Sequence, residues 1–168
     1  MVAPASRFLL TRPRLRLSAP WRQALRNAPC LIDFQGNQRM ALPSEVIDSP
    51  RVPRIGPYSQ AVRVGDLVYT AGQPGIDPTT GRVAGDSFEA QARQAFANLQ
   101  AVLEDGGSSL ARVIKVTCFV ADPDAFPVLN TLFAEFFPVA PPVRSTPLVQ
   151  LPRGLLFSID AVAVVDRG

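Results

Sequence analysis

The pattern of apolar and polar residues becomes regular at about residue 59. Two short alternating stretches, SQAVRV and LVYTAGQ, flank the pair Gly65-Asp66. A glycine-containing pair between two such runs is typical of a tight hairpin turn, so the pattern predicts two antiparallel strands. The turn cluster DPTTG at residues 77–81 leads away from them. We also consider a short extra strand near Arg82–Ala84.

Two later segments carry apolar residues at helical spacing. The first follows Asp86 and Glu89, which we interpret as an N-terminal capping pair, and it stops at Gly106-Gly107. The second is capped by Asp124 in this interpretation, and it ends at the prolines that begin with Pro138. The apolar residues are Phe88, Ala92, Phe96, Leu99 and Leu103 in the first helix, and Phe126, Leu129, Phe133 and Phe136 in the second.

Three further segments predict strands, at residues 113–120, 143–150 and 156–164. In the last of them, Ser158 and Asp160 alternate with apolar residues and therefore face the other side of the strand. The predicted order is β-β-α-β-α-β-β. This order indicates an α+β fold with a single mixed sheet and two helices on one face. No further helix is available for the opposite face, so self-association is its simplest cover.

Residues 1–40 do not follow this pattern. They hold seven arginines and one acid, Asp33, whereas residues 41–168 hold ten basic and thirteen acidic residues. The net charge of +3 therefore comes from the leader and is poor evidence for a nucleic-acid surface. The leader is either an organelle transit peptide or an upstream stretch that precedes a true start at Met40. In both cases we expect a leader that does not pack, followed by a single domain at 41–168.

Composition also bears on location and on the reaction. Apolar runs are too short for a membrane helix, so we expect a soluble protein with no membrane partner. Two cysteines far apart in the sequence give no disulfide framework and indicate a reducing compartment. We therefore expect a cytoplasmic protein, or one of a mitochondrial or plastid matrix if the leader is a transit peptide. The chain has no histidine, which excludes Ser-His-Asp and Cys-His catalysis. Only Cys30 and Cys118 could supply sulfur, so we expect no metal site. A Schiff base at Lys115, the only lysine, would need an activated amine.

Arginine, carboxylate, hydroxyl and backbone groups remain as candidates for catalysis. Arg144 lies in the apolar stretch PPVRSTPLVQLP, and its planar fork suits a carboxylate. The alternative for Arg144 is a salt bridge to an acid such as Asp160 or Glu135. Asp160 is a lone acid in its strand and could act as a general base or orient a water. The alternative for Asp160 is an acid on a solvated strand face.

Two further residues are candidates for substrate binding. Tyr58, in the segment IGPYSQ, could close over a ligand, or it could pack against its own turn. Asn130 stands in the middle of an apolar helix, where a short amide side chain is unfavourable. It could hydrogen-bond either a loop or a substrate. Cys118, within a β-branched run, is expected to be inert core.

Six segments together resemble the Rid family of reactive-intermediate deaminases. They are IGPYSQAV, YTAGQPGIDPTTGRV, QARQAFANLQAVLEDGG, LNTLFAEFF, RSTPLVQLP and IDAVAV, in this order over about residues 50–165. The resemblance implies a chorismate-mutase-like fold and a homotrimer with sites between subunits. It also implies hydrolysis of 2-aminoacrylate and related imines to 2-keto acids and ammonia, without a cofactor.

The same resemblance implies roles for individual residues. Arg144 would bind the substrate carboxylate, and Asp160 would activate water. The substrate-binding residues would also include Tyr58, Gly72, Asn130 and Thr146. The chain departs from the family pattern at three positions: Asp160 replaces a glutamate, Ala71 a serine, and Thr146 the cysteine of many members. A catalytic group displaced by about 1 Å can cost on the order of a hundredfold in rate, so the activity could be weak or tuned to another imine.

Two other functions stay open at this point. Some relatives are described as endoribonucleases or translation inhibitors, but the acidic body of this chain and its lack of interleaved aromatic and basic residues argue against nucleic acid as a partner. A non-catalytic trimer that binds metabolites is the other candidate, and the changes at Ala71 and Asp160 favour it.

Overall fold

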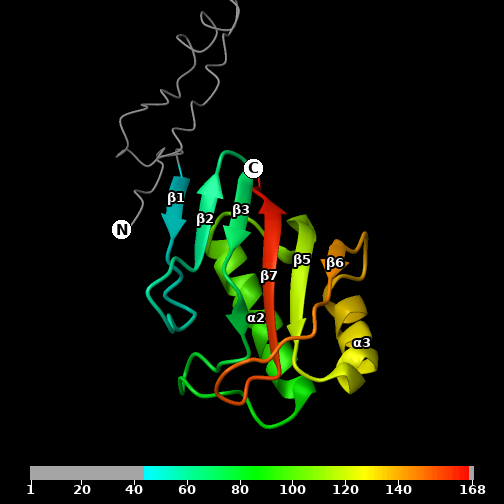
Figure 1. Cartoon of the computed structure of the whole chain (residues 1–168). Coiled ribbons are helices and arrows are strands. Elements are labelled where there is room, and N and C mark those ends of the chain that lie inside the picture. Colours follow the sequence, from blue (N-terminus) through cyan, green and yellow to red (C-terminus); the bar gives the residue numbers. More distant parts are fainter. Residues whose placement is uncertain (1–43, 167–168) are drawn as a thin grey trace, which may run out of the picture. The chain divides into compact units, whose positions relative to one another are not determined.

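In the computed structural model, which describes residues 44–166, the strands form one sheet in the order β1-β2-β3-β7-β5-β6, and β4 pairs with β7 (Figure 1). The pairing of β5 with β6 is parallel, and the other pairings are antiparallel. The strands are β1 (Ser44–Ile47), β2 (Ala61–Val64), β3 (Leu67–Thr70), β4 (Gln73–Pro74), β5 (Val113–Val120), β6 (Val143–Ser145) and β7 (Phe157–Val164).

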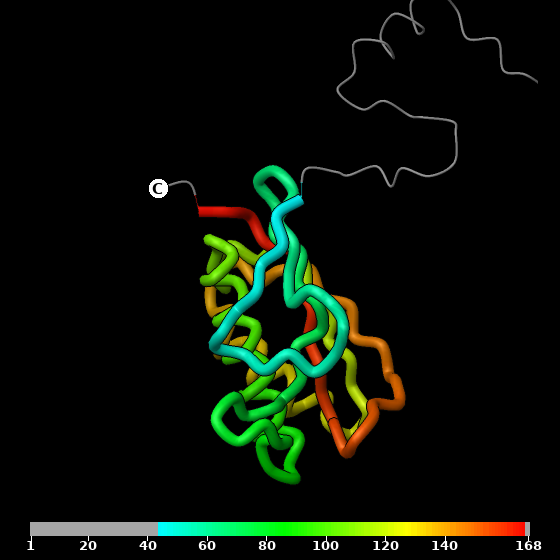
Figure 2. Tube along the Cα trace, turned by 90° about the vertical axis from the view of Figure 1, so that its left-hand side faces the viewer, coloured from blue at the N-terminus to red at the C-terminus, as the bar shows by residue number. Residues whose placement is uncertain are grey.

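Both predicted helices are present, α2 (Phe88–Asp105) and α3 (Phe126–Phe136), with short 3-10 turns η1 (Leu110–Arg112) and η2 (Pro123–Ala125). Seen from the side, the helices lie on one side of the strands (Figure 2). The α+β class with one mixed sheet is therefore confirmed. The helix-facing side chains of β7 are those that alternation indicated: Phe157, Ile159, Ala161 and Ala163 are all buried.

The hairpin between β2 and β3 forms as expected. Val64 pairs with Leu67, and Gly65 between them has a φ of 59°, which glycine adopts without a steric penalty. The stretch after β3 is interrupted by a β-bulge. Three residues separate Tyr69 from Gln73, whereas two separate their partners on β7, Val162 and Ile159. This β-bulge contains Gly72. Next to it, the Ala161 N–H donates to the hydroxyl of Thr70 at 2.9 Å.

Both capping assignments made from the sequence were wrong. Ser87, not Asp86, caps α2, and its hydroxyl accepts a hydrogen bond from the Ala90 N–H at 3.2 Å. Asp124 is not the cap of α3. Instead, the Asp122 carboxylate accepts from the Asp124 N–H and caps η2, which leads directly into α3. The physical reason is that Pro123 begins a helical turn one residue after Asp122.

Replacing Ser87 with alanine should lower the free energy of unfolding by about 1 kcal/mol, because the Ala90 N–H loses its acceptor. Asp86→Ala is the matched control, since it removes an acid beside the same helix without removing the cap. Denaturant unfolding of both variants measures the difference. An equal loss in the two variants would contradict the cap assignment.

Three strand predictions also need correction. β1 was missed, because SEVI is too short to show a period. The strand expected at residues 143–150 ends at Ser145, and the chain makes only an isolated bridge beyond it, between Leu148 and Val120. Pro147 lies at this break and has no N–H to donate. Near Arg82–Ala84 the structure has an isolated bridge between Ile76 and Val83 in place of a strand.

The leader expected at residues 1–40 lies outside the described residues, so that expectation stays a prediction. Among residues 44–166, none of the helices is long and apolar enough to span a membrane.

Candidate functional site

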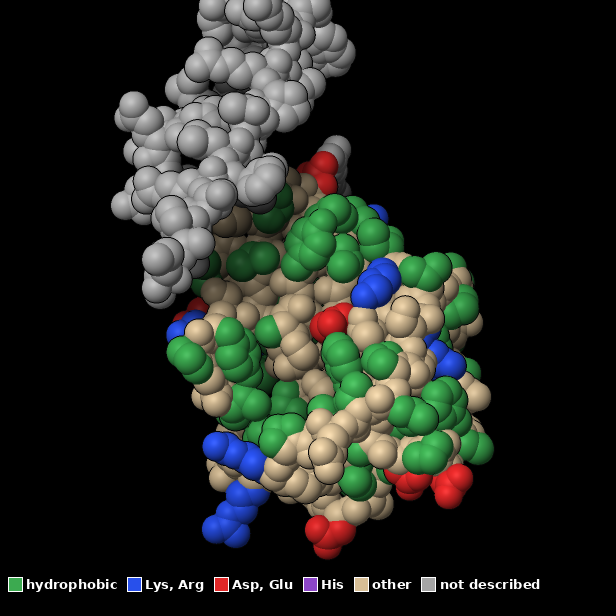
Figure 3. All heavy atoms as spheres, viewed as in Figure 1, with side chains coloured by type: hydrophobic (Ala, Val, Ile, Leu, Met, Phe, Trp, Pro, Cys, Tyr) green, Lys and Arg blue, Asp and Glu red, His purple; other side chains and the backbone are tan. Residues whose placement is uncertain are grey.

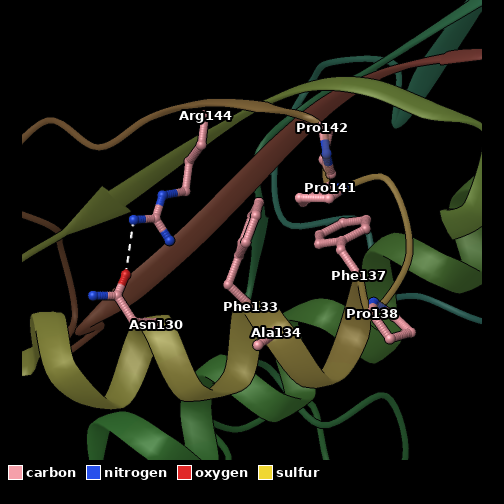
Figure 4. A pocket seen from close by; sticks show the side chains of 8 residues that line it. All are labelled: Asn130, Phe133, Ala134, Phe137, Pro138, Pro141, Pro142 and Arg144. Carbon is pink, nitrogen blue, oxygen red and sulfur yellow. Dashed lines mark hydrogen bonds between the residues drawn. The ribbon is translucent and has the colours of Figure 1, made fainter.

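Arg144 lies on β6, at the edge of the sheet. It pairs with Val116 of β5, which is fully buried beneath the helices. Paired residues of neighbouring strands project to the same face, so Arg144 points toward α3. There its Nη2 donates a hydrogen bond to Asn130 Oδ1 at 2.8 Å, and its guanidinium carbon lies 4.6 Å from the centroid of the Phe133 ring (Figure 4). Two contacts from α3 therefore hold the guanidinium in place.

A pocket of about 480 Å³ opens beside this guanidinium (Figure 4). Apart from Arg144 and Asn130, its walls are apolar. Its lining consists of Asn130, Phe133, Ala134, Phe137, Pro138, Pro141, Pro142 and Arg144. The pocket thus combines a planar cation with an apolar surround, an arrangement that suits a carboxylate attached to an apolar body.

No acid of the described chain neutralises Arg144. Glu135, one of the two acids considered as its partner, is paired with Arg93 at 2.7 Å. Asp160, the other, lies 3.9 Å from Lys115 Nζ. Within residues 44–166, neither acid considered for the salt-bridge alternative pairs with Arg144, and its remaining donors can bind a ligand.

Asp160 projects from the opposite face of the sheet. It pairs with Thr117 of β5, one residue after the partner of Arg144, so alternation turns the two side chains away from each other. Its neighbours on β7, Ile159 and Ala161, are buried beneath the helices, whereas its own side chain is 29% exposed on the helix-free face. Asp160 does not line the pocket beside Arg144.

The match to known proteins includes every described helix and strand except β1. A family model described as Endoribonuclease L-PSP matches residues 49–165. A relative from Dermatophagoides farinae, named 2-iminobutanoate/2-iminopropanoate deaminase, is 37% identical over 126 residues, which cover 74% of this chain and 98% of the relative. The Mus musculus protein of the same name is 36% identical over 122 residues, which cover 71% and 90%.

Solved structures of other proteins also match this chain in fold and sequence. RidA from the Antarctic bacterium Psychrobacter sp. PAMC 21119 matches with a TM-score of 0.69 and 36% identity, covering 72% of this chain and 99% of that one. E. coli TdcF with bound serine matches with a TM-score of 0.69 and 34% identity, covering 73% and 99%. The chain belongs to the Rid family.

Gly72 of this Rid protein lies beside Ser158, which projects to the same helix-free face as Asp160. A Cβ at Gly72 would lie 3.0 Å from Ser158 Oγ, so a larger residue would press on β7 where the bulge brings the two strands together. Thr146 follows β6, and its half-buried side chain does not line the Arg144 pocket.

Tyr58 lies in the loop between β1 and β2 and packs on its own turn. A Cβ at Gly56 would lie 2.7 Å from Tyr58 Cε1, so only glycine leaves room for the ring. Burial raises the pKa of the Tyr58 hydroxyl, and a hydrogen bond with the Ile55 backbone partly opposes this. The residue is 39% exposed and does not line the pocket beside Arg144. In the single chain, Tyr58 therefore packs against its own turn, the second of the two alternatives, and does not close over a ligand.

Sequence reasoning missed two residues near the candidate groups. Phe133 was expected only as core, yet its ring lies beneath Arg144. Its spacing of three from Asn130 places both on one helix face and could have revealed this. Lys115 was considered only as a Schiff-base amine, and nothing in the sequence places it beside Asp160, because that proximity depends on the register of β5 and β7.

Cys118 is confirmed as a buried residue of the core. Burial raises the pKa of its thiol to about 12. Because only the thiolate reacts, we expect Cys118 to resist thiol reagents at pH 8 in the folded protein and to react fully on unfolding. The test is a thiol titration of a Cys30→Ser variant with and without denaturant, and rapid labelling without denaturant would contradict the prediction.

Proposed function

We propose that this Rid protein is a cofactor-independent hydrolase that converts reactive 2-imino acids and their enamine forms to 2-keto acids and ammonia. The observation that carries the proposal is the guanidinium of Arg144, which is held by Asn130 and Phe133, is unpaired with any described acid, and lies beside an apolar pocket. The deaminase names of the two animal relatives support the same chemistry. Every 2-imino acid carries a carboxylate, and the planar guanidinium of Arg144 can bind that group through two parallel hydrogen bonds.

The proposed site needs groups from two subunits. Arg144 and Asp160 project from opposite faces of one sheet, so a single chain does not present both to one small substrate. The helix-free face that carries Asp160 bears clusters of apolar side chains (Figure 3). A row across it includes Val46, Val62, Tyr69, Val162 and Val143, with Lys115 between the last two, and Val143 is 69% exposed. Burying this face against a neighbour removes apolar surface from water.

We therefore propose a homotrimer in which Arg144 of one subunit and Asp160 of its neighbour share a cleft. In that cleft, Arg144 binds the carboxylate, with Tyr58, Gly72, Asn130 and Thr146 as surrounding binding residues. Asp160 accepts a proton from a water that attacks the imine carbon, and the tetrahedral adduct collapses with loss of ammonia. Imines hydrolyse readily in water, so positioning the two reactants provides most of the required acceleration.

The assembly has a direct test. Light scattering of the chain starting at Met40 should give a mass near three chains. Tyr69→Asp, which places a charge on the helix-free face, should shift the mass toward one chain. Ala97→Asp is the control, since Ala97 is exposed on α2 on the opposite side of the sheet, and it should not change the mass. A single-chain mass for the unsubstituted protein at micromolar concentration would overturn the shared site.

The activity is tested by generating 2-iminopropanoate from alanine with an amino-acid oxidase and measuring 2-keto acid and ammonia release above the spontaneous rate. The proposal predicts an excess rate proportional to protein concentration. Binding of 2-keto acids without any excess rate would instead favour the non-catalytic binding trimer.

A further inference from the structure

Lys115 and Asp160 form an isolated charged pair on the helix-free face. Lys115 pairs with Val162 and Asp160 pairs with Thr117, so the two side chains project from neighbouring strands to the same face. Lys115 Nζ lies 3.9 Å from Asp160 Oδ1 and donates a hydrogen bond to Thr117 Oγ1. Within residues 44–166, it is the only cation at ion-pair distance from Asp160.

Hydrolysis of an imine needs an acid as well as a base. The base removes a proton from water, but the nitrogen must also gain protons before it can leave as ammonia. The chain has no histidine to do both. Near Asp160, the hydroxyls of Thr117 and Ser158 are much weaker acids than an ammonium group. Lys115, with 42% of its side chain exposed, can reach a ligand on this face.

We propose that Lys115 is the general acid of the reaction and works with Asp160 as the base, an inference that rests on the proposed deaminase function. As the water oxygen bonds to the imine carbon, Asp160 takes a proton from the water, the C=N π pair moves to nitrogen, and Lys115 gives nitrogen a proton. Asp160 then returns its proton to the same nitrogen. The C–N bond breaks with its electron pair on nitrogen, and ammonia leaves. The hydroxyl proton passes to the Lys115 amine as the C=O bond forms, so both residues are restored.

This role explains why a lysine, and not an arginine, stands here in a chain with sixteen arginines and one lysine. A guanidinium would pair equally well with Asp160, but it does not release a proton in proteins. An ammonium can both carry the charge and transfer the proton.

The test compares Lys115→Ala with Lys115→Arg in the otherwise unchanged full chain, using 2-iminopropanoate. Lys115→Arg keeps the positive charge beside Asp160 and serves as the matched control for electrostatics. Both variants should lose about a hundredfold in kcat with little change in KM, since Lys115 acts on the reacting nitrogen and not on the carboxylate. Thermal melting checks that each variant is folded.

Chemical rescue separates proton transfer from charge. Trimethylammonium carries an N–H, whereas tetramethylammonium has the same charge and no transferable proton, and neither condenses with a keto acid. Activity of Lys115→Ala should rise with trimethylammonium and not with tetramethylammonium. Full activity of Lys115→Arg, or no difference between the two cations, would overturn the assignment of Lys115. Absence of turnover by the unsubstituted protein would instead overturn the deaminase function itself.

Discussion

Replacing Arg144 with lysine is expected to lower kcat/KM for 2-imino acids by about a hundredfold, which corresponds to roughly 2.7 kcal/mol of transition-state stabilisation. Lysine keeps the charge but lacks the planar fork that can donate two parallel hydrogen bonds to a carboxylate. It also loses the stacked position over Phe133 and the fixed hydrogen bond to Asn130. The dissociation constant for pyruvate, measured by calorimetry, should rise in parallel.

Arg93→Lys is the control for Arg144→Lys. Arg93 is paired with Glu89 and Glu135 on the exposed helix surface, and such surface pairs contribute little. This variant should keep both the pyruvate affinity and the turnover of the unsubstituted protein. If Arg144→Lys also kept them, the carboxylate would be bound elsewhere.

Asp160→Asn is expected to produce the other large effect, a loss of about a hundredfold to a thousandfold in kcat with pyruvate binding almost unchanged. The amide has nearly the shape of the carboxylate but cannot accept the proton of the attacking water. Asp166→Asn, which removes the surface partner of Arg112 near the end of the described chain, is the matched control and should leave kcat unchanged. Unaltered turnover in Asp160→Asn would show that another group activates the water.

Asp160→Glu extends the same side chain by one methylene and introduces the residue that the family resemblance implies at this position. If the shorter side chain limits the rate, kcat on 2-iminopropanoate should rise in this variant. If Lys115 and Thr117 already place the shorter carboxylate correctly, the longer one will be displaced and kcat will fall. The direction of the change therefore reports whether the aspartate is a defect or an adaptation.

The fold could be predicted from the sequence wherever a long period was present. The alternation in β7 assigned Ile159 and Asp160 to opposite faces, and the helical spacing in α2 assigned Phe96 to the core, as the structure confirms. Short elements were different. β1 has four residues, as β2 and β3 do, but it lacks the adjoining Gly65-Asp66 turn that indicated those two strands. β6 ends before Pro147 and has only three residues.

The candidate residues could be identified from the sequence, but their mutual arrangement could not. Whether Arg144 and Asp160 share a face depends on the registers of β5 with β6 and with β7. A shift of one residue in either register would place the two side chains on the same face. The same register brings Lys115 to Asp160. These pairings are set by packing across the whole sheet, which no local pattern encodes.

The most direct test of the shared site is a mixture of two variants that each have strongly reduced activity. Arg144→Lys and Asp160→Asn subunits are unfolded together in equal amounts, refolded, and assayed on 2-iminopropanoate. In random mixed trimers, roughly one cleft in four combines an intact Arg144 from one subunit with an intact Asp160 from its neighbour, so about a quarter of the unsubstituted activity should return. A mixture no more active than the two variants refolded separately would contradict a site built between subunits.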